Sequence, residues 1–65
     1  MTQYYDSNGT YKAYTKDGKN LFSETGEYIG YFMNGFLYNP SGVAIGHIKD
    51  KKILDKKGQT IYYSN

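Results

Sequence analysis

The feature that most constrains this chain is a repeat of about sixteen residues that runs through its length. One column of the repeat holds the glycines Gly9, Gly26, Gly42 and Gly58. A phosphate-binding loop would instead place a single glycine cluster between a strand and a helix. We therefore interpret these glycines as the period of a fold and not as a nucleotide site.

Aligned on the glycines, the chain divides into four copies within one domain, residues 1–65. The copies are residues 4–20, 21–36, 37–52 and 53–65. Each opens with two apolar or aromatic residues, followed by a four-residue turn that begins with Asp, Ser or Asn and ends with the glycine. The polar side chain accepts backbone hydrogen bonds, and the glycine takes a positive φ without a Cβ clash. Each copy therefore contains a predicted β-turn between two strands.

A second turn follows a seven-residue stretch rich in Tyr, Ile, Phe and Thr. Asp17-Gly18 and Asn34-Gly35 are strong signals for two-residue hairpins, because both central residues of a type I′ turn need φ > 0. Asp50-Lys51 keeps the frame without the glycine, so we expect a looser turn there. The fourth copy stops before its second turn, and we expect residues 1–3 to pair with it and close a ring.

These signals predict an all-β fold without a helix. Four β-hairpin repeats of about sixteen residues would form an up-and-down meander of eight strands around a pseudo-fourfold axis. Residues 4–63, with D/N-x-x-G turns and strands such as "YIGY", resemble the small bacterial and phage four-fold β-flower proteins. The resemblance implies this fold, but that family has no well-defined activity from which a function would follow.

Alternation of side chains sorts the longer strands into two predicted faces. One face carries the columns Tyr11, Tyr28, Ala44 and Thr60; Ala13, Gly30, Gly46 and Tyr62; and Thr15, Phe32, Ile48 and Ser64. The other carries Lys12, Ile29, Ile45 and Ile61, and Tyr14, Tyr31, His47 and Tyr63. The small residues of one column leave room for an aromatic ring or for close backbone approach near the axis. Both faces are partly apolar, so we expect one to pack within the chain and the other to meet a partner or ligand.

Catalysis is not indicated by the residues present. The chain has no cysteine and a single histidine, which argues against a Cys/His zinc site. The aspartates Asp6, Asp17, Asp50 and Asp55 are explained by turn geometry. We therefore expect no enzyme activity, no cofactor and no metal site.

The candidate ligand-binding site is the column Tyr14, Tyr31, His47 and Tyr63. Either the histidine is an amphipathic ring that stands in for a tyrosine, or the column clusters near the axis and stacks on a sugar or nucleobase. In the second case Lys12, Lys16 and Lys49 would contact phosphates as point charges. The first hypothesis is thus a non-catalytic module that sequesters a small nucleotide-type or other phosphorylated ligand, for example a phage protein that binds a host immune signal.

Two further hypotheses compete with ligand binding. A domain of 65 residues buries only about 60% of the surface of its unfolded chain, and no disulfide supplements its core, so we expect a homo-oligomer. The protein would then be an assembly or adaptor module with an apolar face of Ile29, Met33, Phe36 and Ile45. Glycan or cell-wall binding is disfavoured, because tryptophan is absent and no export signal is visible.

Partners are also constrained by charge and hydropathy. The net charge is +2, and all eight basic residues are lysines. Without arginine for bidentate contacts, a nucleic-acid partner is not expected. No apolar run approaches the length of a membrane span and the amino terminus lacks a signal-like pattern, so we expect no membrane partner and a cytoplasmic protein. We also expect a bacterial or phage origin.

Overall fold

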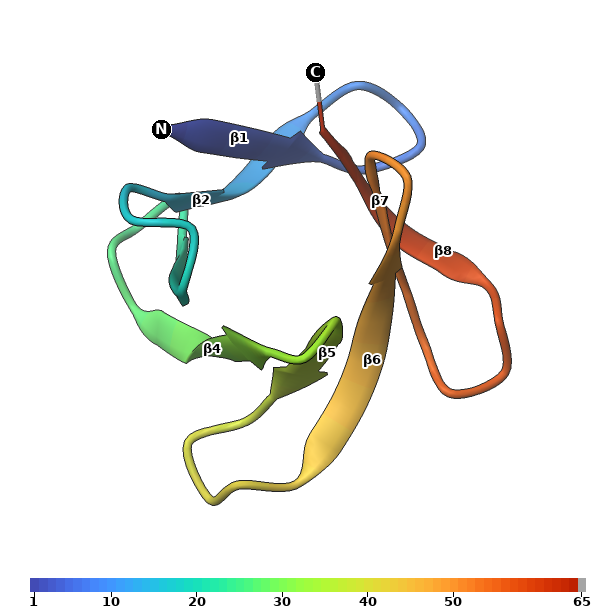
Figure 1. The fold of residues 1–65 in the computed structure, drawn as a ribbon. Helices are drawn as coiled ribbons and strands as arrows, with labels where there is room; N and C mark the ends of the chain where they lie inside the picture. The colour runs from blue at the N-terminus through green and yellow to red at the C-terminus, as the bar shows by residue number, and fades with distance from the viewer. Residues whose placement is uncertain (65) are drawn as a thin grey trace.

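The chain forms a closed barrel of eight antiparallel strands in the computed structural model, which describes residues 1–64 (Figure 1). The strands are β1 (Thr2–Tyr5), β2 (Tyr11–Thr15), β3 (Asn20–Ser23), β4 (Tyr28–Met33), β5 (Phe36–Tyr38), β6 (Ala44–Lys49), β7 (Lys52–Leu54) and β8 (Thr60–Ser64). Each strand pairs with its neighbours in sequence, and β1 pairs with β8. The predicted all-β meander of four hairpins is confirmed. No helix in the described residues is long and apolar enough to cross a membrane.

The ring closes within one chain, but not through the residues that the sequence suggested. Tyr4 and Tyr5 pair with Ser64 and Tyr63, whereas within residues 1–64 Thr2 and Gln3 pair with β2 and not with β8. The strands of a closed barrel are staggered, so the end of β1, and not its beginning, reaches β8. Within the described residues the ring therefore closes through Tyr4 and Tyr5 and not through residues 1–3. The last residue of the fourth copy, position 65, lies outside the described residues.

Four long turns, residues 6–9, 23–26, 39–42 and 55–58, join the strands of each hairpin and radiate outward from the ring (Figure 1). In the first, Asp6 Oδ1 accepts hydrogen bonds from the amides of Asn8 and Thr10, at 2.9 and 3.0 Å. Gly9 donates to the Asp6 carbonyl at 3.0 Å and has a φ of 80°. The same pattern recurs after Ser23, Asn39 and Asp55. The predicted chemistry of these turns is confirmed.

Three short turns, residues 16–19, 33–36 and 49–52, connect successive hairpins. Asn34 and Gly35 both have positive φ, 55° and 83°, as predicted. Asp50 adopts a φ of 57° without a following glycine, because Asp, like Asn, tolerates the left-handed region. Lys49 pairs with Lys52 as Met33 pairs with Phe36, so the third turn keeps its two-residue length, but Lys51, unlike Gly35, does not take a positive φ.

The first short turn departs from the predicted two-residue hairpin. β2 ends at Thr15 and β3 begins at Asn20, because the first copy is one residue longer. The Asp17 carboxylate fills this wider turn and accepts hydrogen bonds from the amides of Asn20 and Lys19, at 2.9 and 2.8 Å. These bonds favour the ionised form and lower the pKa of Asp17.

A β-bulge in every long-turn hairpin overturns part of the predicted face assignment. Tyr4 pairs with Ala13 but Tyr5 pairs with Tyr11, which leaves Lys12 as the extra residue. The register shifts in the same way in the other hairpins, where the extra residues are Ile29, Ile45 and Ile61. A bulge interrupts strict alternation, so the column that begins at Tyr11 was given the wrong face, and in the column that begins at Lys12 the residues Ile29 and Ile45 pack against the core.

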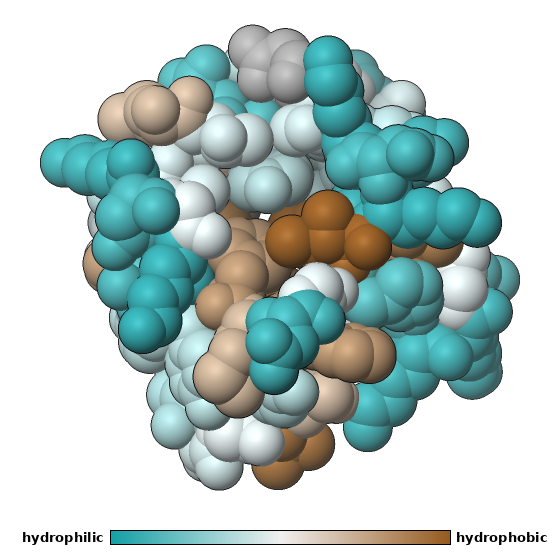
Figure 2. All heavy atoms as spheres, viewed as in Figure 1, coloured by the Kyte–Doolittle hydropathy of each residue, from teal (hydrophilic) through white to brown (hydrophobic). Residues whose placement is uncertain are grey.

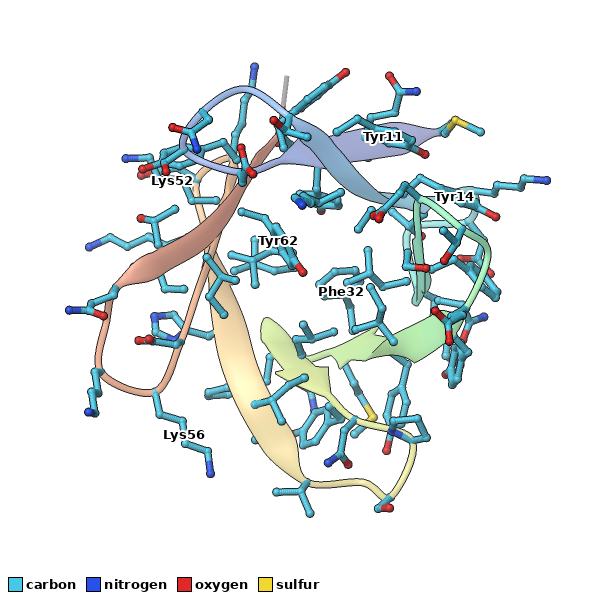
Figure 3. All side chains as sticks on the ribbon, turned by 180° about the vertical axis from the view of Figure 1, so that it is seen from behind. Tyr11, Tyr14, Phe32, Lys52, Lys56 and Tyr62 are labelled. Carbon is cyan, nitrogen blue, oxygen red and sulfur yellow. The ribbon has the colours of Figure 1, made fainter. Side chains whose placement is uncertain are left out.

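The core is a single cluster inside the barrel, built on the first apolar residue of each copy. Tyr4, Leu21, Leu37 and Ile53 are each 7% exposed or less. Phe32 and Tyr62 point into the same interior from opposite parts of the ring (Figure 3). Ile29 and Ile45 pack against the cluster from the bulges. The interior is therefore filled by side chains.

Close backbone approach explains the small residues Gly30 and Gly46. A Cβ on Gly30 would collide with the carbonyl oxygen of Tyr38, and a Cβ on Gly46 would collide with that of Leu54. Both carbonyls belong to adjacent strands. The predicted close approach is confirmed, but it occurs between neighbouring strands and not at the barrel axis.

Candidate functional site

Most aromatic side chains lie on the outer wall of the barrel. Of nine tyrosines and three phenylalanines, only Tyr4, Phe32 and Tyr62 belong to the core or pack against it. Most of the other rings alternate with core residues along the strands and therefore point outward, and Tyr11 and Tyr28 pair with two of these outward rings, Tyr5 and Phe22. The outer wall, not the interior, is where this protein concentrates its aromatic surface.

The candidate column Tyr14, Tyr31, His47 and Tyr63 does not gather near the axis. These residues pair with Phe22, Tyr38, Leu54 and Tyr5 at four separate strand junctions around the outside. Tyr14 lies between the buried Ala13 and Thr15, which forces its ring outward (Figure 3). The expected axial cluster is wrong in its geometry. Two of the pairs do stack, with centroid distances of 5.7 Å for Tyr14–Phe22 and 5.4 Å for Tyr31–Tyr38.

The three candidate lysines are separated as well. Lys12 lies at a bulge, with its Nζ atom 4.0 Å from Asp6 Oδ2 beside a long turn. Lys16 and Lys49 belong to two different short turns at the other end of the barrel. Residues 1–64 also contain no cavity and no group of three residues placed to hold a metal ion. The binding role of the seven candidate residues stays a prediction.

A continuous apolar and aromatic surface covers the outside of β4, β5 and β6. Tyr31 pairs with Tyr38, and Met33 pairs with Phe36. Phe36 pairs in turn with His47 and meets that ring edge-on, with centroids 6.4 Å apart. Met33 and Phe36 are 48% and 47% exposed. We call these five residues the outer aromatic patch.

Comparison with known proteins agrees with this architecture. The family described as "4-fold beta flower protein" matches residues 2–65. The chain belongs to this family. No curated protein and no solved structure matches it. The family description names a fold and states no activity.

The four-fold symmetry of the β-flower shows which patch residues the fold does not require. Met33 occupies the position that Lys16 and Lys49 hold in other copies. Phe36 pairs with His47. At the equivalent places in the other copies the partner of the column residue is polar: Gln3, Asn20 or Lys52. The same ladder therefore forms with polar side chains elsewhere in the β-flower. The fold therefore does not require the apolar pair Met33–Phe36 on this part of the surface.

Sequence analysis identified part of this surface. It grouped Met33 and Phe36 with Ile29 and Ile45 as one apolar face, but the bulges turn the two isoleucines toward the core. It also missed Tyr38, which belongs to the patch through its stacked pair with Tyr31. Tyr38 follows the buried Leu37 in the opening pair of its copy, and this position in the repeat could have indicated an outward-facing ring.

Proposed function

We propose that this protein is a non-catalytic assembly module that binds a second copy of itself through the outer aromatic patch. The observation that supports the proposal is the half-exposed Met33–Phe36 pair, which extends the stacked rings of Tyr31 and Tyr38. Small domains without disulfides gain stability from self-association. The patch supplies the surface for it.

The composition of the patch is that of an interface centre. Aromatic residues and methionine are enriched at the centres of protein interfaces, and most charged residues are depleted there. The five patch residues include no Asp, Glu, Lys or Arg. Two patches can therefore meet without burying an unpaired charge, which would be costly.

The edges of the patch carry charges of both signs, which a second copy of the chain could pair across the interface. On the β3 side lies Asp17, whose carboxylate is kept ionised by backbone hydrogen bonds. On the β7 side lie Lys49 and Lys52. In a two-fold dimer whose axis runs along the strands, the β3 edge of each copy faces the β7 edge of the other. Asp17 of each copy can then face Lys49 or Lys52 of the other, and the same β3 edge also carries Lys16 and Lys19.

The interface must extend beyond the patch itself. A specific interface of ordinary size covers about 800 Å² on each partner, and the accessible surface of the chain is 4277 Å². The contact would thus take about a fifth of the surface. The patch forms its apolar centre, and the two charged edges form its rim.

The test is the oligomeric state of Met33→Lys/Phe36→Lys by light scattering after size exclusion. These substitutions introduce the residue found at the equivalent positions 16, 49 and 52, so we expect an unchanged circular dichroism spectrum and a monomer. The matched control is Val43→Lys/Ile61→Lys, which adds the same charge at exposed sites outside the patch and should stay dimeric. A dimer that persists in the patch variant would overturn the proposal.

The ligand hypothesis can be tested on the same samples. A stacked pair such as Tyr31 and Tyr38 offers a small ligand an aromatic surface on the outer wall. If a nucleotide-type ligand occupies it, the protein purified from its cells should carry a discrete extra mass that is lost on denaturation. A dimer without extra mass supports assembly alone.

A further inference from the structure

Charge is unevenly divided between the two ends of the barrel. The end with the short turns carries five lysines against two aspartates, a net charge of +3, and these residues are Lys16, Lys19, Lys49, Lys51, Lys52, Asp17 and Asp50. The end with the long turns carries three lysines against four acidic residues, a net charge of −1, and these are Lys12, Lys56, Lys57, Asp6, Glu24, Glu27 and Asp55. The short-turn end is therefore more cationic than the overall charge of +2 indicates.

The lysines of this end are available to a partner. Within residues 1–64, the one ion pair joins Lys12 and Asp6 beside a long turn. Asp17 is occupied by amides of its own turn. Lys52 lies over the ring of Tyr63, with its Nζ atom 5.8 Å from the centroid, a contact that leaves its charge in place. No carboxylate in the described part of the chain neutralises the five lysines.

An apolar side chain lies between the two lysine-bearing turns. These turns belong to the first and third connections of the four-fold ring and so lie on opposite sides of it. Ile48 faces the mouth of the barrel next to Lys49 and is 38% exposed. Figure 2 shows apolar side chains near the centre of the ring with hydrophilic ones on both sides. The equivalent positions of Ile48 in other copies include Thr15 and Ser64, so the fold does not require an isoleucine there.

We propose that the short-turn end binds the surface of a bilayer that contains anionic lipid. The lysines contact headgroup phosphates, and Ile48 enters the interfacial region between them. The molecule is flattened, with extents of 27 × 25 × 16 Å, so the face of the ring in Figure 1 is broad and suits a planar partner. This proposal does not depend on self-association, because it uses the end of the barrel and not the outer aromatic patch.

A bilayer fits this end better than a nucleic acid does. Nucleic-acid surfaces combine basic residues with aromatic rings on which bases stack, whereas the side chain that faces the mouth of the barrel is the aliphatic Ile48, and the rings of Phe36 and Tyr63 at this end face the outer wall. Aliphatic surface gains by entering the lipid interface, and lysines near an anionic surface attract it without specific geometry. The sequence argued only against a membrane-spanning segment, and surface binding needs none.

The test is cosedimentation of the full chain with vesicles of phosphatidylcholine, made with or without an equal share of phosphatidylserine. We expect binding only to the vesicles with phosphatidylserine, and weaker binding as salt is added. Lys16→Gln/Lys49→Gln should weaken binding roughly 25-fold, since each lysine at such a surface contributes about a five-fold factor. The matched control Lys56→Gln/Lys57→Gln removes the same charge from the other end and should bind like the unmodified protein. Ile48→Ser should lower the affinity and keep the salt dependence.

Several results would overturn the proposal. One is the absence of binding to the phosphatidylserine vesicles, and another is an equal loss for the two lysine pairs, which would mean that only net charge matters. A third is unchanged vesicle binding by Ile48→Ser together with equally tight binding of single-stranded RNA, because the partner would then be any polyanion. Met33→Lys/Phe36→Lys adds two lysines to the short-turn end and should bind the vesicles at least as tightly while it loses self-association, so the two proposals can fail separately.

Discussion

The hairpin connections β4–β5 and β6–β7 have the same length and closing register, although Gly35 and not Lys51 takes a positive φ, and they differ in surface. Asn34 and Asp50 adopt φ values of 55° and 57° at the same place in the turn. The carbonyl oxygens of Gly35 and Lys51 both accept a hydrogen bond from the next hairpin, at 2.8 and 2.7 Å. Yet one turn is flanked by an apolar pair and the other by two lysines, and these pairs are Met33–Phe36 and Lys49–Lys52.

This difference teaches that the fold and the surface are specified by separate positions. The positions that repeat in every copy build the turns, bulges and core. The positions beside the short turns point outward and vary from copy to copy without changing the ladder. Each quarter of the ring can therefore acquire its own surface, and one quarter has become apolar while another has become cationic.

The largest expected effect comes from a position that the fold does require. Gly30→Ala places a Cβ against the Tyr38 carbonyl, and we expect it to destabilise the protein by roughly 3 kcal/mol, because the neighbouring strand must move. Urea unfolding followed by circular dichroism measures this. Ala13, in the same column of the first copy, already carries a Cβ, so Ala13→Gly should have a much smaller effect. Equal stability of Gly30→Ala and the unmodified protein would show that the close approach is not structural.

An intermediate effect is expected from moving the apolar pair to the lysine-bearing turn. Lys49→Met/Lys52→Phe copies the surface of β4–β5 onto β6–β7, which gives each chain two apolar patches in different directions. Such a chain can bind two neighbours and form open assemblies, so light scattering should show species larger than a dimer. The control Lys56→Met/Lys57→Phe adds the same residues to a long turn and should not. An unchanged dimer in both variants would show that an apolar pair at this place does not drive association.

The smallest effect is expected at the first short turn. Hydrogen bonds from the amides of Asn20 and Lys19 lower the pKa of Asp17 below its unfolded value, so the carboxylate stabilises the folded state above the unfolded pKa. That contribution is lost as the pH falls through the folded pKa. Asp17→Asn should lower Tm slightly at neutral pH and flatten the acid side of the Tm profile. Asp50→Asn removes the same charge in a turn where Asn34 shows that asparagine fits, and a similar loss of Tm there would contradict this account.

Local chemistry made much of the fold predictable from the sequence. The long turns could be read because a residue such as Asp6 and its Gly9 determine the turn without help from the rest of the chain. The eight strands followed from the spacing of these turns. The first short turn could not be read in the same way, because a single extra residue replaced the two-residue hairpin at Asp17-Gly18 with side-chain hydrogen bonds.

Positions that depend on strand pairing were not predictable. The bulge residues, such as Lys12 and Ile29, look like ordinary members of an alternating strand, and only the register shows that they are extra. One of the two interpretations of the column that includes His47 placed it near the axis, although it lies outside. Met33 and Phe36 were recognised as apolar, but their contact with Tyr31 and Tyr38 required the register of β4 and β5.

The most direct measurement is native mass spectrometry of the unmodified protein and of Met33→Lys/Phe36→Lys at the same concentration. The account predicts a mass of two chains for the unmodified protein and of one chain for the variant, with both folded by circular dichroism. A single-chain mass for the unmodified protein, or a two-chain mass for both proteins, would contradict the claim that the outer aromatic patch is an assembly surface.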